Sequence, residues 1–169
     1  MHNVGLPHDW IIAECFGLDE ECLSFVPQPT IAVIAVIESL EADKGSRELG
    51  DLSLPVDFYM KQTSKLDCAC GIIACIHSVL NNKTHIALAE DSVLGKFQKS
   101  CEGKSPEVCA KLLEDNNEFK STHSGFAAQG QSEQAQDTES VKYHFIAFVR
   151  SEEGKIIEYD GLKQGPLVI

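Results

Sequence analysis

The chain has 169 residues, 43% of them hydrophobic and 24% charged, and a formal net charge of -12. This length fits one globular domain that can bury a core without disulfides or metals. The acidic balance argues against a nucleic-acid-binding protein, because phosphates are held by basic surfaces, and it favours basic partners instead.

The sequence gives no sign of secretion or of membrane insertion. Residues 1–10 lack the basic start and apolar run of a signal peptide, and the longest apolar run, Ile31–Ile37, is far shorter than a membrane span. The cysteines number seven, and an odd count without a secretion signal predicts reduced thiols. We therefore expect a cytoplasmic protein with no membrane contact, in which one cysteine could be a nucleophile.

The first third of the chain predicts two short helices and two strands. Asp9–Phe16 and Asp19–Phe25 are interpreted as short helical segments. Ile31–Ile37 is β-branched and continuously apolar, which predicts a central strand covered on both faces. Charged Glu38–Pro55 predicts a surface loop, and Val56–Lys61 predicts a second strand.

The middle of the chain is predicted to be helical. Gly71–Leu80 is apolar nearly all round, which is typical of a buried helix. Asp91–Cys101 and Ser105–Phe119 predict amphipathic helices, the second with Ser105 as its N-cap. Residues 121–140 are rich in Gln, Ser, Gly and Ala, and they predict a mobile crossover loop, with a tolerated insertion as the alternative.

Two apolar, β-prone runs near the C-terminus predict a hairpin. Tyr143–Val149 and Lys155–Tyr159 are separated by Ser151–Gly154, which contains Gly and acidic residues. With the turn centred near Glu152, the pairing register places His144 opposite Asp160 within one residue. Directly opposed side chains on one face lie close together, so Asp160 could orient the His144 imidazole.

Cys70 directly precedes the predicted buried helix Gly71–Leu80. The positive end of a helix and a nearby imidazole both lower the pKa of a thiol, and the thiolate is the nucleophile. Each residue also has an ordinary interpretation: Cys70 as a small hydrophobe, His144 as a core histidine, and Asp160 as a turn residue. Only their combination favours thiol-dependent catalysis.

Several segments together resemble the ubiquitin carboxyl-terminal hydrolase family. The likeness covers nearly the whole chain, and its motifs are specific as a set. They are LPHDW at 6–10, GLDEECLSFVPQP at 17–29, FYMKQT at 58–63, ACG at 69–71, IH at 76–77, SPEVCAKLLEDN at 105–116, GQ at 130–131, YHFIAFV at 143–149 and EYDG at 158–161.

The resemblance implies a role for each candidate site residue. Cys70 would be the nucleophile, His144 the general base and acid, Asp160 the orienter, and Gln62 an oxyanion-hole donor together with the backbone N–H of Cys70. The implied reaction is hydrolysis of small or flexible adducts at the C-terminal glycine of ubiquitin, with residues 121–140 crossing over the site.

The resemblance also implies an overall architecture. We expect a single domain over residues 1–169 with an α/β fold, in which an antiparallel-rich central sheet is flanked by helices in a papain-like layout. We expect a monomer that needs no cofactor or metal and whose partner is ubiquitin, not nucleic acid.

The chain departs from the family pattern in three places. Gln62 lies eight residues before Cys70 where the family has six, so Cys68 stands at the usual separation. The turn between His144 and Asp160 is one residue longer than usual, and both ends of the domain look short. A ubiquitin-binding module without turnover is therefore the second hypothesis. A metal or redox cluster of Cys68, Cys70, Cys75 and His77 is a third, which the spacing disfavours.

Overall fold

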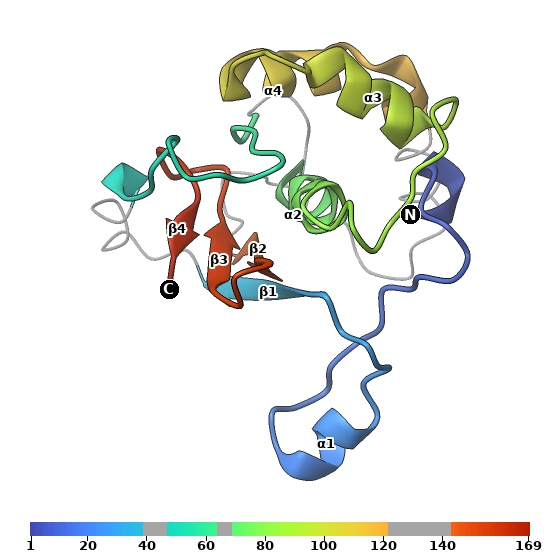
Figure 1. Ribbon diagram of the computed structural model, residues 1–169, viewed down its shortest axis with the longest axis vertical. Helices are drawn as coiled ribbons and strands as arrows, with labels where there is room; N and C mark the ends of the chain where they lie inside the picture. The colour runs from blue at the N-terminus through green and yellow to red at the C-terminus, as the bar shows by residue number, and fades with distance from the viewer. Residues whose placement is uncertain (39–46, 64–68, 122–142) are drawn as a thin grey trace.

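The computed structural model describes residues 1–38, 47–63, 69–121 and 143–169 (Figure 1). Among these residues, none of the helices is long and apolar enough to cross a bilayer. The elements, in chain order, are η1 (His2–Val4), α1 (Glu20–Ser24), β1 (Ala32–Glu38), α2 (Ala69–Leu80), α3 (Val93–Cys101), α4 (Pro106–Asp115), β2 (Tyr143–Arg150), β3 (Ile156–Tyr159) and β4 (Leu167–Val168).

The strands form one antiparallel sheet in the order β1-β2-β3-β4. Helix α2 packs against β2 and β1, and α3 and α4 lie on the far side of α2 from the sheet (Figure 1). This arrangement confirms the expected α/β class with an antiparallel sheet and packed helices. The short strand β4 was not predicted, because two residues are too few to give a periodic pattern.

Strand β1 lies at the edge of the sheet, so the prediction of a central strand covered on both faces is wrong. Among the described strands its one neighbour is β2, with pairs that run from Ala32 and Val149 to Glu38 and Tyr143. Val33 and Val36 are 54% and 56% exposed. A short apolar run indicates β propensity, but it does not indicate how many neighbouring strands the strand pairs with.

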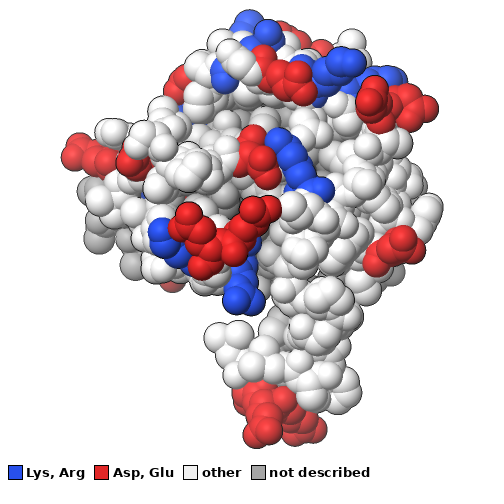
Figure 2. All heavy atoms as spheres, in the orientation of Figure 1, with Lys and Arg blue, Asp and Glu red and all other residues white. Residues whose placement is uncertain are grey.

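Residues 11–30 project away from the sheet and the other helices (Figure 1). Asp19 caps α1 by accepting from the Cys22 N–H, which confirms the helical segment expected there. The helix expected over Asp9–Phe16 is absent, and Phe16 is 80% exposed. A short helix without a core to pack on is only marginally stable. Figure 2 shows acidic side chains at the tip of this projection, where α1 begins.

The strand expected over Val56–Lys61 is also absent, because its backbone groups pair with helices. The Phe58 N–H donates to Asn81 Oδ1, and the Met60 N–H donates to Nε2 of His77 on α2. The Lys61 N–H donates to the Pro106 carbonyl at the start of α4. The segment is therefore extended and buried without belonging to the sheet.

The helices predicted for the middle of the chain are present with shifted ends. Helix α2 begins at Ala69, two residues before the predicted start, and α3 begins at Val93. Helix α4 has Ser105 as its N-cap and Pro106 in its first turn, as expected, but it ends at Asp115. Residues 39–46 of the predicted loop at 38–55, and nearly all of the predicted loop at 121–140, lie outside the described residues.

Helix α2 contributes to both hydrophobic clusters of the molecule. On one side, Ile73, Ile76 and Leu80 pack in a cluster with Leu94 and Phe97 of α3. On the other, Ala74 packs in a second cluster that holds side chains of β2 and β3. Because α2 lies between the two clusters, the position of its first turn is fixed from both sides.

Leu94 should carry a large share of the stability of the first cluster, since it is fully buried. We expect Leu94→Ala to lower the free energy of unfolding by about 2–5 kcal/mol, because it removes buried methyl groups and leaves a cavity. The matched change Leu18→Ala, at a side chain that is 86% exposed, should cost less than about 0.5 kcal/mol. Urea unfolding followed by circular dichroism measures both, and equal losses would contradict this description of the core.

Candidate active site

Cys70 lies in the first turn of α2, as its second residue. The sequence placed it just before the helix, and the difference arises because the helix starts earlier, at Ala69. The thiol is half-buried, and the unpaired N–H groups of the first turn give this end of the helix a partial positive charge. A developing thiolate is therefore favoured at this position.

His144 and Asp160 form a buried hydrogen-bonded pair. Nε2 of His144, near the start of β2, lies 2.7 Å from Oδ1 of Asp160, which directly follows β3. Both residues are 7% exposed. The Asp160 carboxylate also accepts the Leu162 N–H at 2.9 Å. With Nε2 engaged by the carboxylate, Nδ1 is the ring nitrogen left to interact with a thiol.

The hairpin brings this pair together in a register that differs by two residues from the predicted one. Ala147 pairs with Tyr159 and Arg150 with Ile156, so the turn is centred on Glu153. The longer turn closes with a bond from the Ser151 N–H to the Lys155 carbonyl. A shift of two residues keeps the same face, so His144 meets Asp160 diagonally and the contact is preserved.

Cys70 lies close enough to His144 for the imidazole to affect its thiol. Burial raises the pKa of the Cys70 thiol. Hydrogen bonds with the His144 side chain and with the backbone of Phe145 and Gly71, together with the charge of His144, lower the pKa by more than burial raises it, so the net shift is downward. The Phe145 ring also lies beside Gly71, which places the strand residue after His144 against the first turn of α2. Helix and strand therefore meet at the thiol.

The imidazole and the carboxylate are both held in their charged forms. Burial lowers the pKa of His144, but hydrogen bonds and charge interactions with Asp160 and Cys70 raise it to about 9. Burial raises the pKa of Asp160, but the bonds from His144 and the Leu162 N–H and the charges of His144 and Lys163 bring it below its usual value. These shifts favour a thiolate–imidazolium pair at neutral pH.

Gln62 lies beside the aspartate segment through its main chain. Its N–H donates to the Gly161 carbonyl at 2.8 Å, and a Cβ on Gly161 would lie only 2.7 Å from the Gln62 nitrogen. Its Oε1 is buried and has no hydrogen-bond partner among the residues that the structure describes. A buried amide oxygen left unpaired is costly and calls for an explanation. Residues 64–68, which include Cys68, lie outside the described residues.

Sequence reasoning missed two groups that hold Asp160. The bond from the Leu162 N–H could have been predicted, because Asp before Gly favours a turn in which the side chain accepts a nearby backbone N–H. The Tyr59 hydroxyl donates to the Asp160 carbonyl at 2.7 Å. This bond could not have been predicted, since 101 residues separate the two. No local pattern carries that information.

The proposed metal cluster is not supported by the placement of its members. Nε2 of His77 accepts the Met60 N–H, and its ring stacks on Tyr59. Cys70 instead interacts with His144. No group of three or more metal-ligating side chains occurs in the part of the chain that the structure describes.

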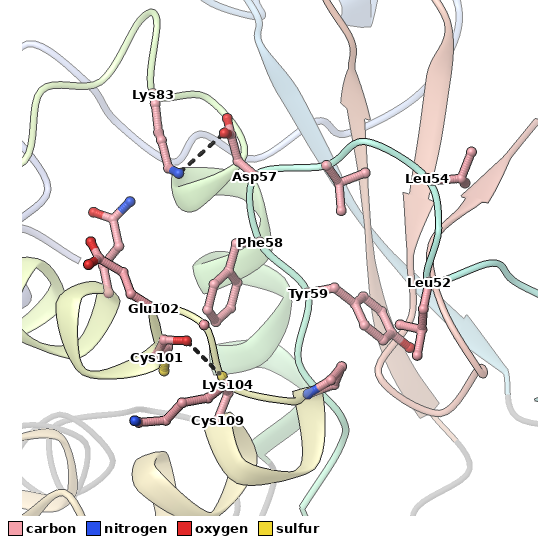
Figure 3. A pocket seen from close by; sticks show the side chains of 14 residues that line it. Leu52, Leu54, Asp57, Phe58, Tyr59, Lys83, Cys101, Glu102, Lys104 and Cys109 are labelled. Atoms are coloured by element: carbon pink, nitrogen blue, oxygen red, sulfur yellow. Dashed lines mark hydrogen bonds and ion pairs between the residues drawn. The ribbon is translucent and has the colours of Figure 1, made fainter.

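A separate cavity of about 400 Å³ lies between the 52–59 segment and the end of α3 (Figure 3). Phe58 and Tyr59 line it from one side, and Cys101 and Cys109 line it from the other. None of the three candidate catalytic side chains lines this cavity, so it is distinct from the site around Cys70.

A thiol at a helix start, an imidazole and a carboxylate are the arrangement that cysteine hydrolases use. The sequence model described as ubiquitin carboxyl-terminal hydrolase, family 1, matches residues 1–169. The chain belongs to this family, as its motifs predicted.

Named relatives agree with this assignment. A probable ubiquitin carboxyl-terminal hydrolase of Dictyostelium discoideum is 34% identical over 96% of this chain and 66% of its own length. Ubiquitin carboxyl-terminal hydrolases of Drosophila melanogaster and Aplysia californica are 33% and 30% identical over 99% of this chain, and 74% and 78% of their own lengths.

Solved structures agree on the fold. The catalytic domain of UCH37 from Trichinella spiralis, bound to ubiquitin vinyl methyl ester, matches with a TM-score of 0.63 and 21% identity over 83% of this chain. The match covers 60% of that domain, and this chain spans slightly less than two thirds of the Dictyostelium relative.

The pKa shifts predict a distinctive reactivity for Cys70. Its alkylation by iodoacetamide should reach the plateau rate at lower pH than that of Cys75, whose pKa burial raises. His144→Gln should move the Cys70 profile to higher pH, because the hydrogen bond and the charge are both lost. Mass spectrometry of labelled peptides from about pH 5 to about pH 10 measures this. An unchanged Cys70 profile in His144→Gln would rule out the thiol–imidazole interaction.

Proposed function

We propose that this chain is a thiol-dependent hydrolase that cleaves small or flexible adducts from the C-terminal glycine of ubiquitin. The observation that carries the proposal is the buried His144–Asp160 pair, 2.7 Å apart, beside a thiol in the first turn of α2. Membership of the family supports the substrate class, as does the similar Trichinella domain, which is bound to an electrophilic ubiquitin ester.

Each group has a defined step in the reaction. The Cys70 thiolate attacks the carbonyl carbon of the terminal glycine, and the tetrahedral intermediate collapses to a thioester while protonated His144 gives its proton to the leaving amine or alcohol. Neutral His144 then removes a proton from water as the water attacks the thioester. Free ubiquitin leaves, and the thiolate–imidazolium pair is restored. Asp160 keeps the ring oriented throughout and stabilises its positive charge.

Gln62 has the role of an oxyanion donor in this proposal, together with the backbone N–H of Cys70. The donor in this role would be the Nε2 amide group, because the amide oxygen Oε1 can only accept hydrogen bonds. A preorganised donor of this kind is typically worth roughly 2.7–4 kcal/mol in the transition state.

The charge of the chain fits the proposed partner. A net charge of -12 favours approach of the basic C-terminal tail of ubiquitin. That the chain works as a cytoplasmic monomer, without contact to nucleic acid or membrane, remains part of the proposal.

Ubiquitin vinyl methyl ester should label wild-type protein at Cys70, because the thiolate adds to the vinyl group. Cys70→Ala should abolish the adduct, whereas the matched variants Cys68→Ala and Cys75→Ala should keep most of it. Intact mass measurement followed by peptide mapping gives the modified residue.

Two outcomes of this experiment would count against the proposal, the first against Cys70 as nucleophile and the second against the hydrolase. Labelling that disappears only in Cys68→Ala would move the nucleophile to Cys68. Tight binding of ubiquitin with no adduct in any variant would favour the binding module, to which the changed spacing between Gln62 and Cys70 also points.

A further inference from the structure

We propose that Tyr59 is a positioning residue whose hydroxyl holds the turn carrying Asp160, so that the carboxylate stays aimed at His144. The inference rests on the proposed function, and it adds a residue that holds the backbone of Asp160 in place.

The Tyr59 hydroxyl reaches both ends of the turn that follows β3. Its oxygen lies 2.7 Å from the Asp160 carbonyl and 2.7 Å from the Lys163 carbonyl. The turn is closed by the Lys163 N–H, which donates to the Asp160 carbonyl at 3.0 Å. The single hydroxyl proton is shared between the two carbonyl oxygens, so one buried hydroxyl contacts both the first and the last residue of the turn.

Neighbours of Tyr59 hold the middle of the same turn. The Gln62 N–H donates to the Gly161 carbonyl, and Nζ of Lys61 donates to the Lys163 carbonyl. Tyr59, Lys61 and Gln62 thus each contact the turn. A movement of Tyr59 would be passed directly to the backbone of Asp160.

Tyr59 is itself held in place by the core. Its ring stacks on His77 with a centroid distance of 5.4 Å and an interplanar angle of 1°. His77 is fully buried in α2 and accepts the Met60 N–H at 3.1 Å. Burial lowers the pKa of His77 to about 3, which keeps the ring neutral and able to accept. The ring of Tyr159 lies 5.5 Å from His77.

The direction of the side chain fits this role. Phe58 and Tyr59 point to opposite sides of their segment (Figure 3). Phe58 turns towards α3, where its ring lies 6.2 Å from that of Phe97. Tyr59 turns towards the sheet side, and its hydroxyl meets the end of β3. A side chain that only packs in the core would need no hydroxyl here. Removing that oxygen alone therefore separates the packing of the ring from the positioning of the turn.

The position of the turn matters because the Asp160 carboxylate has two donors to satisfy. Oδ1 accepts both Nε2 of His144 and the Leu162 N–H. A displaced turn would lengthen the bond to His144, lower the pKa of the imidazole and remove part of the charge that stabilises the Cys70 thiolate. Misplacement by about 1 Å can cost roughly 100-fold in rate.

Tyr59→Phe tests the proposal, with Tyr159→Phe as the matched control. The control also removes the hydroxyl of a buried tyrosine whose ring lies next to His77, but a hydroxyl for which the described residues show no hydrogen bond. We expect Tyr59→Phe to lower kcat on a ubiquitin C-terminal ester by about 10- to 100-fold with little change in KM. The control should stay within about threefold of the wild-type chain.

Two further readouts separate positioning from a structural role. The pH profile of Cys70 alkylation should move to higher pH in Tyr59→Phe and stay in place in Tyr159→Phe. Combining Tyr59→Phe with Asp160→Asn should cost little more than Asp160→Asn alone, because both changes act through one carboxylate. An unmoved alkylation profile or fully additive losses would overturn the proposal.

The alkylation readout uses no ubiquitin, so it distinguishes failure of this inference from failure of the proposed hydrolase. If Tyr59→Phe does not fold, amide hydrogen exchange in the wild-type chain tests the same claim. The Lys163 amide should exchange as slowly as those of β3, and exchange at the rate of an open turn would overturn it.

Discussion

The buried hydrogen bond between His144 and Asp160 is the contact on which the candidate site depends. It joins the start of β2 to the turn after β3, and it stabilises a charged imidazole that would otherwise be neutral in a buried position. Without the carboxylate, burial would dominate, the pKa of His144 would fall, and the thiol would lose its cationic neighbour. The reactivity proposed for Cys70 is thus a consequence of one bond on a neighbouring hairpin.

The rest of the fold brings the thiol to that bond. Helix α2 has side chains in both hydrophobic clusters, so its first turn cannot shift without disturbing one of them. The 58–62 segment gives its backbone hydrogen bonds to α2, α4 and the aspartate turn instead of to a strand. A segment that is irregular by itself therefore connects α2, which carries Cys70, to the turn that carries Asp160.

The parts of the structure that local patterns determine could be predicted from the sequence. The N-cap at Ser105, the buried helix that begins near Cys70 and the hairpin carrying His144 each follow from residues close together in the chain. The register was wrong by two residues, yet the contact survived because the side-chain period of a strand is two.

What could not be predicted depends on partners far away in the sequence. β propensity alone could not show that β1 is an edge strand, and Val56–Lys61 looked like a strand although its backbone bonds go to helices. The support of Asp160 by Tyr59 spans 101 residues and has no local signature.

The most direct test of this account is the titration of His144 followed by nitrogen-15 NMR in the wild-type chain and in Asp160→Asn. Because its pKa is raised to about 9, the wild-type imidazole should remain protonated at pH 7 and lose its proton only well above that. In Asp160→Asn the midpoint should fall towards or below the ordinary histidine value of about 6.5. A wild-type midpoint near 6.5, unmoved by Asp160→Asn, would contradict the claim that this carboxylate holds the imidazole charged beside Cys70.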